Sequence, residues 1–336
     1  MAQMELTQGS QQAGWWRSFS KSSSPYLYLF PAFLVMTVIT FYPMFYQIYM
    51  AFHEFSLKNL RAGGPPPVAV GFANFINILT GNIGLSNFNF FYTLGFNLWW
   101  TFSNVFLHVA FGILIAVMLN TSGLWFKGLW RAIYVLPIVI PQIIIANVFR
   151  NMYDPDYGAI NQGLAIFGKL LGLSPNLFHI RWIDQLAYPI PGIPLTLSFF
   201  ALLICNVWLG WPFMAIVATG ALQSIPKDLY EAAEIDGASG NQKFWTITLP
   251  LLRPAMVPAT VYGITATFNL YTLIYFLSGG GPLRKTEILL TEAYRLVNEQ
   301  NAYGDAAAFA IMIFIILLGL TVLTNSFTRA TERYDV

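Results

Sequence analysis

Long apolar stretches alternate with short polar segments along most of this chain of 336 residues. An α-helix needs about 20 mostly apolar residues to cross the hydrocarbon core of a bilayer. Backbone groups cannot stay unpaired in lipid, so such stretches predict helices rather than open strands. The pattern therefore predicts an all-α membrane protein, a polytopic bundle of about six transmembrane helices at Tyr26–Ala51, Phe96–Leu119, Ala132–Met152, Leu195–Leu222, Pro250–Leu277 and Ala306–Thr328.

The same pattern divides the chain into three parts. A mostly polar segment, 1–25, precedes the bundle at 26–328, and a short tail follows at 329–336. No small-residue cleavage pattern follows the first span, so we expect that span to be retained. An even number of spans places both termini on one side. The loops on that side are slightly denser in Lys and Arg, which indicates cytoplasmic termini.

Prolines interrupt several of the predicted spans. Each proline removes a helix hydrogen bond and can kink the helix. In a membrane such breaks are tolerated where neighbouring helices or a water-lined cavity satisfy the freed carbonyls. For one proline, irregular packing is the simpler explanation. Together the prolines favour a bundle with a cavity over a simple anchor: Pro43, Pro137, Pro141, Pro212, Pro254 and Pro258.

Composition agrees with a membrane protein. Hydrophobic residues make up 56% of the chain and charged residues only 10%, whereas soluble domains have about 25% charged residues. The net charge of +2 gives no basic surface for nucleic acid. A single cysteine, Cys205, excludes an internal disulfide, and the histidines His53, His108 and His179 match no metal-ligand spacing.

The chain lacks the residues that would power transport by itself. No Asp, Glu, Lys or Arg falls in the middle of a predicted span, and such charges usually serve ion or proton coupling. The stretch GLAIFGK (Gly163–Lys169) nearly matches a phosphate-binding loop, but Leu170 replaces the Ser or Thr that would hold magnesium. We expect any nucleotide to be bound by another chain.

A polar loop at 223–249 separates the fourth and fifth spans. Ser224 and Pro226 indicate a helix start, and Gly237 supplies the left-handed residue that often ends a helix. Ser239 can begin a second short helix. The residues predict a helix–turn–helix with a small-residue face. By themselves they fit docking on a partner and lying on the membrane surface about equally well.

The segment EAAEIDGASGNQKFWTITLPLLRP (Glu231–Pro254) resembles the EAA loop of ABC-importer permeases, whose pattern is EAA, a glycine and an I-x-L-P ending. The segments NVWLGWPFMAI, GALQSIPKDLYEAAEIDGA and FLSGGGP extend the resemblance to the sugar-contacting permease of the maltose/maltodextrin type. Residues 53–90 are too few for the large periplasmic domain that some members insert there. The resemblance implies a cytoplasmic coupling helix that docks on an ATP-binding subunit through Leu229, Glu231, Ala232, Ala233, Asp236 and Gly237.

The resemblance also implies an assembly and a location. The chain would be a permease subunit of an ATP-driven importer that moves an oligosaccharide such as maltose or maltodextrin, or another disaccharide, by alternating access. Its partners would be a second permease, two ATP-binding subunits (or a homodimer) and an extracytoplasmic solute-binding protein in a bacterial or archaeal cytoplasmic membrane. ATP and Mg would be bound by a partner, so this chain would need no cofactor and would not be an enzyme.

Carried over by position, the family's substrate contacts fall on Leu209, Gly210, Phe213, Gly263, Ala266, Thr267 and Leu270. At four of these, Phe213, Gly263, Thr267 and Leu270, the maltose-type pattern has polar Tyr, Ser and two Asn. Sugar hydroxyls need partners, because an unpaired polar group in a dry site costs about 1–3 kcal/mol. Asn206 and Asn269 are candidates to supply them, and interhelical hydrogen bonds explain these two asparagines equally well.

Other functions stay open at this point. Glycerol-3-phosphate or a polyol is the main alternative substrate, although no basic residues accompany the pocket positions. An ion-coupled secondary carrier is disfavoured by the uncharged spans. An intramembrane enzyme would need converging reactive side chains, and the spans offer only His108 and Cys205. The run Gly279–Pro282 is most simply a turn after the fifth span, with contact to a binding protein as the alternative.

Overall fold

The computed structural model describes residues 26–328 except Ser122. The predicted segments 1–25 and 329–336 lie outside the described residues. Five helices of the described part are long and apolar enough to cross a membrane, with a sixth if one bent pair is counted as a span. These helices confirm the predicted all-α bundle, and they run over Tyr26–Ala51, Phe90–Asn120, Leu197–Ser224, Gly240–Phe268 and Tyr303–Ser326.

The predicted third span, Ala132–Met152, is broken at one of the two prolines expected to interrupt it. The structure has α6 (Lys127–Val139) and α7 (Gln142–Met152), which meet at an angle of 96°. Pro141 disfavours the helical conformation of the residue before it, and Ile140 accordingly adopts φ −80° and ψ 130°. The break turns the N-terminus of α7 towards the neighbouring helices.

Two other span boundaries differ from the predicted ones. Helix α5 (Phe90–Asn120) begins six residues earlier than Phe96, because the Asn89 side chain accepts a hydrogen bond from the Tyr92 amide at 2.9 Å. Helix α12 (Leu249–Phe268) ends at Asn269, and a separate helix α13 (Tyr271–Leu277) follows. The predicted fifth span is therefore two helices.

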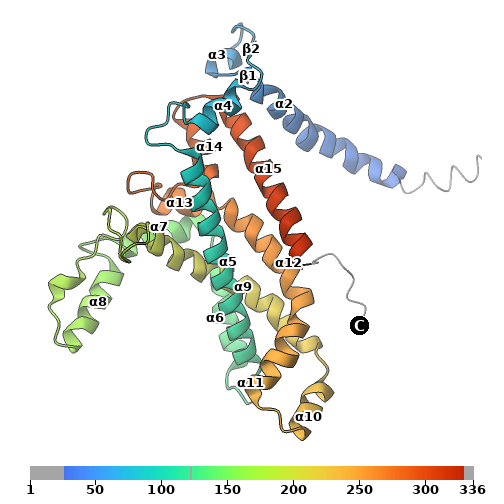
Figure 1. Cartoon of the computed structure of the whole chain (residues 1–336), viewed down its shortest axis with the longest axis vertical. Helices are drawn as coiled ribbons and strands as arrows, with labels where there is room; N and C mark the ends of the chain where they lie inside the picture. Colours follow the sequence, from blue (N-terminus) through green and yellow to red (C-terminus); the bar gives the residue numbers. More distant parts are fainter. Residues whose placement is uncertain (1–25, 122, 329–336) are drawn as a thin grey trace, which may run out of the picture.

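The smaller elements gather around the ends of the bundle (Figure 1). The near match to a phosphate-binding loop lies inside α8 (Ala159–Leu170), and a continuous helix cannot wrap a phosphate as that loop does. Strands β1 and β2 pair antiparallel, with His53 opposite Ala69. The remaining bounds are η1 (Thr37–Phe41), α2 (Tyr42–Ala51), β1 (His53–Glu54), α3 (Leu57–Leu60), β2 (Val68–Ala69), α4 (Ala73–Thr80), η2 (Pro175–Phe178), α14 (Leu289–Asn298) and α15 (Tyr303–Thr328).

Helices α5 and α9 (Leu197–Ser224) form the centre of the bundle. A side chain at Gly112 would place its Cβ 2.4 Å from the Met214 Cβ, so glycine is what allows the two backbones to approach. One face of α5 carries a buried polar stripe, at positions spaced by three and four residues: Asn97, Thr101, Asn104 and His108. Each of the four is less than 5% exposed.

The long axis of the molecule separates two kinds of structure (Figure 1). The short helices α10 (Lys227–Ile235) and α11 (Gly240–Lys243) lie at one end. The β1–β2 hairpin, α4 and α14 lie at the other. The first helix, Tyr26–Ala51, splays away from the bundle, and none of its most apolar window is buried by the rest of the described chain.

Candidate functional site

A cavity of about 550 Å³ lies between the middle of α9 and the C-terminal end of α12. Its size falls within the range of about 300–1,000 Å³ typical of ligand pockets. Helix α5 and the break between α6 and α7 complete its walls, the latter through Pro137, Ile138 and Ile140. The pocket is therefore built around a helix that Pro141 interrupts.

Seven of the eight predicted substrate residues line this one cavity. Gly263, Ala266, Thr267 and Leu270 follow the spacing i, i+3, i+4, i+7, and on α9 Leu209 and Phe213 are four residues apart. Such spacing keeps residues on one face of a helix. The Phe213 and Tyr262 rings pack together with centroids 5.5 Å apart. The eighth residue, Asn269, is at the C-terminal cap of α12 and does not reach the wall, which receives Leu209, Gly210, Phe213, Gly263, Ala266, Thr267 and Leu270.

Three polar side chains line the cavity although the sequence did not predict that they bind substrate. They are His108 from α5, Gln142 from the first turn of α7 and Tyr262 from α12. A fourth polar side chain, Asn206, also lines the cavity, and the sequence analysis named it as a candidate partner for sugar hydroxyls. The signal for His108 was present in the sequence, since it ends the polar stripe of α5.

The polar groups of α5 and α9 form a chain of hydrogen bonds. The Asn206 amide donates to the Asn104 side-chain oxygen at 2.8 Å, and the Asn104 amide donates to the Trp100 carbonyl at 2.7 Å. His108 Nε2 lies 2.9 Å from the backbone carbonyl oxygen of Asn206. The ring also fills the space beside Gly210, where an added Cβ would come within 2.2 Å of it. Gly210 thus makes room for an imidazole.

The polar loop at 223–249 folds as the predicted helix–turn–helix. Gly237 has φ +79° and ends α10, and the Ser239 side chain caps α11 by accepting from the Gln242 amide at 3.3 Å. Ser224, expected to cap α10, is instead the last residue of α9, and its hydroxyl donates to the Ala221 carbonyl. Pro226 occupies the N-terminal cap position without a side-chain bond.

We call residues 226–243, from Pro226 to Lys243, the finger. Its two arms are joined by an ion pair of 2.6 Å between Lys243 Nζ and Glu234 Oε1. No residue of α10 is buried by the described part of the chain. The exposed surface includes apolar side chains, with Leu229 44% and Ile235 88% exposed. Exposed apolar side chains on a helix at the tip of a projection suit contact with another molecule.

The finger connects directly to both helices of the cavity. Helix α9 carries Phe213 and ends at Ser224, immediately before the finger. On the other side, α11, the π-helical segment η3 (Phe244–Thr248) and α12 form one continuous helix of 29 residues from Gly240 to Phe268, which carries Gly263 and Thr267. Tyr230 on α10 and Thr248 bond through their hydroxyls at 3.0 Å, which fixes the finger to this helix.

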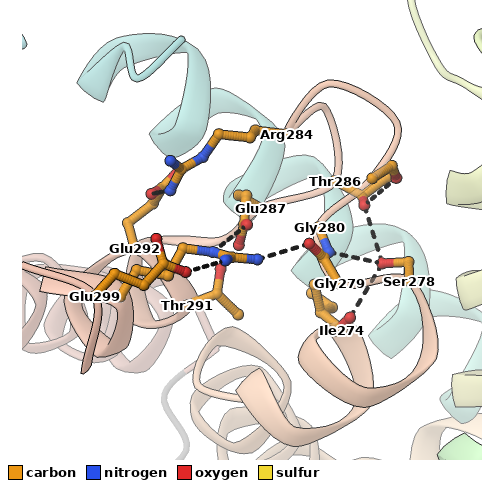
Figure 2. A network of polar contacts seen from close by, with 12 residues as sticks. Ile274, Ser278, Gly279, Gly280, Arg284, Thr286, Glu287, Thr291, Glu292 and Glu299 are labelled. Atoms are coloured by element: carbon orange, nitrogen blue, oxygen red, sulfur yellow. Dashed lines mark hydrogen bonds and ion pairs between the residues drawn. The ribbon is translucent and has the colours of Figure 1, made fainter. Parts of the chain in front are cut away.

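A second polar cluster stabilises the turn after α13 (Figure 2). Gly279 and Gly280 both have positive φ, and a Cβ at Gly280 would strike the Glu287 carboxylate at 2.1 Å. This confirms that the run Gly279–Pro282 forms a turn. We call the charged residues around it the α14 ion-pair cluster, which consists of Arg284, Glu287, Glu292, Arg295 and Glu299.

Glu287 and Glu292 are the buried centre of the α14 ion-pair cluster, whereas Glu299 is exposed. Arg295 donates to Glu287 at 2.7 Å and to the Gly279 carbonyl at 2.7 Å, and Arg284 pairs with Glu292. The side chains of both glutamates are 1% exposed. Burial raises the pKa of Glu287, and burial together with the Glu287 carboxylate raises the pKa of Glu292 to about 7, while the arginines act in the opposite direction.

Comparison with known proteins identifies the family. Residues 108–333 match the family described as binding-protein-dependent transport system inner membrane component. The chain is 32% identical over 307 residues to the galactooligosaccharides transport system permease protein GanP of Bacillus subtilis (strain 168), which covers 89% of this chain and 68% of that protein. It is also 32% identical over 297 residues to the trehalose/maltose transport system permease protein MalF of Thermococcus litoralis, which covers 88% of this chain and 90% of that protein.

Solved structures show the same fold. A bacterial ABC transporter involved in the import of the acidic polysaccharide alginate superimposes with a TM-score of 0.74, over 95% of this chain and 99% of that chain, at 21% identity. The fold and the matches in sequence therefore point to the same family. The chain belongs to the family of binding-protein-dependent transport system inner membrane components.

Proposed function

We propose that this chain is the permease subunit through which an ATP-driven importer moves a neutral carbohydrate, an oligosaccharide or disaccharide, across the membrane. One observation carries the proposal most directly. Seven positions that the family resemblance assigns to sugar contact, on two helices separated by the polar loop, line one cavity of about 550 Å³. The names of relatives 32% identical to the chain refer to galactooligosaccharides and to trehalose and maltose.

The chemistry of the cavity supports a neutral sugar over a phosphorylated polyol. Among the described residues that line it, none is Asp, Glu, Lys or Arg. A phosphate group would favour arginine or lysine partners. The aromatic rings of Phe213 and Tyr262 offer faces for the apolar side of a sugar ring. The lining therefore suits a ligand with hydroxyl groups and no net charge.

The finger supports coupling to an ATP-binding subunit. Glu231, Ala232, Asp236 and Gly237 are exposed, Ala233 is half-buried, and no residue of α10 is fully buried by the described part of its own chain. The helix from Gly240 to Phe268 has 29 residues, which at about 1.5 Å per residue gives a rod roughly 40 Å long. Such a rod transmits movement of the finger to Gly263 and Thr267 in the cavity.

The proposed cycle follows from this geometry. Two ATP-binding subunits close on ATP and pull the finger of each permease, and the helices around the cavity change from an inward-facing to an outward-facing arrangement. ATP drives this population shift because it binds the two states with different affinity. The finger is then cytoplasmic, and the β1–β2 hairpin lies at the opposite end of the molecule (Figure 1). We infer that the turn at Gly279–Pro282 faces the solute-binding protein. A second permease covers the exposed apolar faces.

Substitutions in the cavity test the assignment of the sugar site. We expect Phe213→Ala and Thr267→Leu to reduce sugar uptake several-fold and to change preference among sugars, because both side chains line the cavity. Uptake of maltotriose, trehalose and lactose by the reconstituted transporter measures this. The control is Phe314→Ala, because Phe314 is 64% exposed on α15 and does not line the cavity. Unchanged rates and preferences in both cavity variants would contradict the site.

A further inference from the structure

His108 brings the polar stripe of α5 to the wall of the cavity. The residue is 4% exposed, and its Nε2 lies 2.9 Å from the Asn206 carbonyl oxygen. A carbonyl oxygen can only accept a hydrogen bond, so Nε2 carries the proton. In the neutral ring Nδ1 is then an acceptor. Nδ1 has no hydrogen-bond partner among the residues that the structure describes, and it is not sealed from solvent.

The position of the ring is fixed on both sides. An added Cβ at Gly210 would lie 2.2 Å from Cε1 and 2.5 Å from Nδ1 of His108, so the ring packs directly on the α9 backbone. The Asn206 side chain is itself held by Asn104, with 2.8 Å between amide nitrogen and oxygen. An acceptor held in this way loses little freedom when a ligand binds.

Besides His108, the cavity wall carries four polar side chains, Gln142, Asn206, Tyr262 and Thr267, and the Asn206 amide is already bonded to Asn104. Phe213, Gly263 and Leu270 provide only apolar surface or backbone at positions where the resembled pattern has polar side chains. A hydroxyl group that enters such a site without a partner is penalised. Nδ1 of His108, on α5, is an acceptor without a partner among the described residues and can bind such a hydroxyl group.

We propose that His108 is a substrate-binding, specificity-determining residue, whose Nδ1 accepts a hydrogen bond from a sugar hydroxyl while Nε2–H stays bonded to the Asn206 carbonyl. The inference rests on the proposed function and assigns its hydroxyl recognition to α5. In this arrangement α9 and α12 supply shape, apolar faces and the further polar side chains Asn206, Tyr262 and Thr267. The selection of one hydroxyl over a missing or inverted one comes from the imidazole.

The test separates the acceptor from the packing of the ring. His108→Phe keeps a ring beside Gly210 but has no polar atom, and His108→Leu is a second apolar variant in case the first does not assemble. His108→Asn can place its amide oxygen near the position of Nδ1 and so keeps an acceptor for the sugar, but it is too short to replace the Nε2 bond to the Asn206 backbone carbonyl. The matched control is Thr101→Val, which removes a buried polar group from the same helix, away from the cavity.

The complete transporter, with its ATP-binding subunits and binding protein in proteoliposomes, is assayed for uptake of maltotriose, trehalose and lactose, and of monodeoxy analogues of the best of them. We expect the apolar variants to lose about tenfold in uptake at limiting sugar, the Asn variant to stay within about threefold, and Thr101→Val to match wild type. Wild type should discriminate about tenfold against one deoxy analogue, and the apolar variants should not.

The outcomes distinguish failure of the proposed transport function from failure of the role assigned to His108. If wild type takes up none of these sugars with ATP, the proposed function fails. If wild type takes up a sugar and the apolar variants transport it equally well, with unchanged discrimination among the analogues, His108 is not the acceptor. An Asn variant as impaired as the apolar ones overturns the acceptor role as well, because the effect then comes from the ring itself.

Discussion

We expect Glu231→Lys to abolish ATP-driven uptake and to leave the protein folded in the membrane. Glu231 lies on α10, which the described part of its own chain does not bury, so the change disturbs no internal packing. In the proposed assembly the helix docks on an ATP-binding subunit, and a reversed charge in a desolvated contact costs several kcal/mol. Uptake should fall to background, because the subunit that hydrolyses ATP no longer moves the permease.

The measurement combines three readouts on the reconstituted complex. Sugar uptake should be lost, the melting temperature of the purified permease should be unchanged, and copurification of the ATP-binding subunit should be weakened. The control is the same charge reversal at Glu54, an exposed glutamate in β1 at the opposite end of the molecule. Wild-type uptake by the Glu231→Lys variant would show that the finger does not couple to ATP.

The second large effect concerns stability. We expect Arg295→Met to destabilise the protein by about 3–5 kcal/mol, because it leaves a buried carboxylate without its partner. Glu287 is 1% exposed and bonds Arg295 at 2.7 Å. The same change removes the donor to the Gly279 carbonyl, and with it the anchor of the turn after α13. A drop in the melting temperature of the detergent-purified permease reports this loss.

A double variant separates the charge from the packing. Replacing both members of the pair, Arg295→Met with Glu287→Gln, removes the buried charge together with its partner and should recover most of the lost stability. The cycle of single and double variants isolates the interaction between them. If the double variant is as unstable as Arg295→Met alone, the ion pair is not what stabilises the turn.

Hydropathy alone predicts most of the spans, because the requirement for about 20 apolar residues is a simple one. It does not predict where helices break. Pro212, Pro254 and Pro258 all lie inside continuous helices, whereas Pro141 separates two helices at 96°. Proline alone therefore does not determine whether the helix breaks. The outcome depends on whether neighbouring groups satisfy the freed carbonyls, and that is a property of the tertiary structure.

The cavity likewise contains residues that the sequence predicts and residues whose position depends on the tertiary structure. The resemblance assigned seven of its residues by position, and helical spacing alone explains why those on one helix share a face. His108 could not be assigned in this way, because its place depends on Gly210 and Asn206, about a hundred positions away in the chain. Asn269 was expected at the site because of its polarity, but the end of α12 turns it away from the wall.

The charges at the turn after α13 were not predicted as a cluster. Arg284 and Arg295 lie in a loop and a short helix outside every predicted span, where isolated charges usually face water. The turn at Gly279 and Gly280 brings Glu287 back against its own backbone, and the two arginines follow it into the interior. Only the folded turn makes these charges neighbours.

The most direct test of the account is accumulation of labelled maltotriose, trehalose or lactose in proteoliposomes that contain this permease, its partner permease and the ATP-binding subunits, with binding protein supplied at the outer face. If the finger couples the permease to ATP, accumulation requires ATP at the face bearing the finger and persists when ion gradients are collapsed. Accumulation driven by an ion gradient without ATP, or no accumulation of any of these sugars with ATP present, would contradict it.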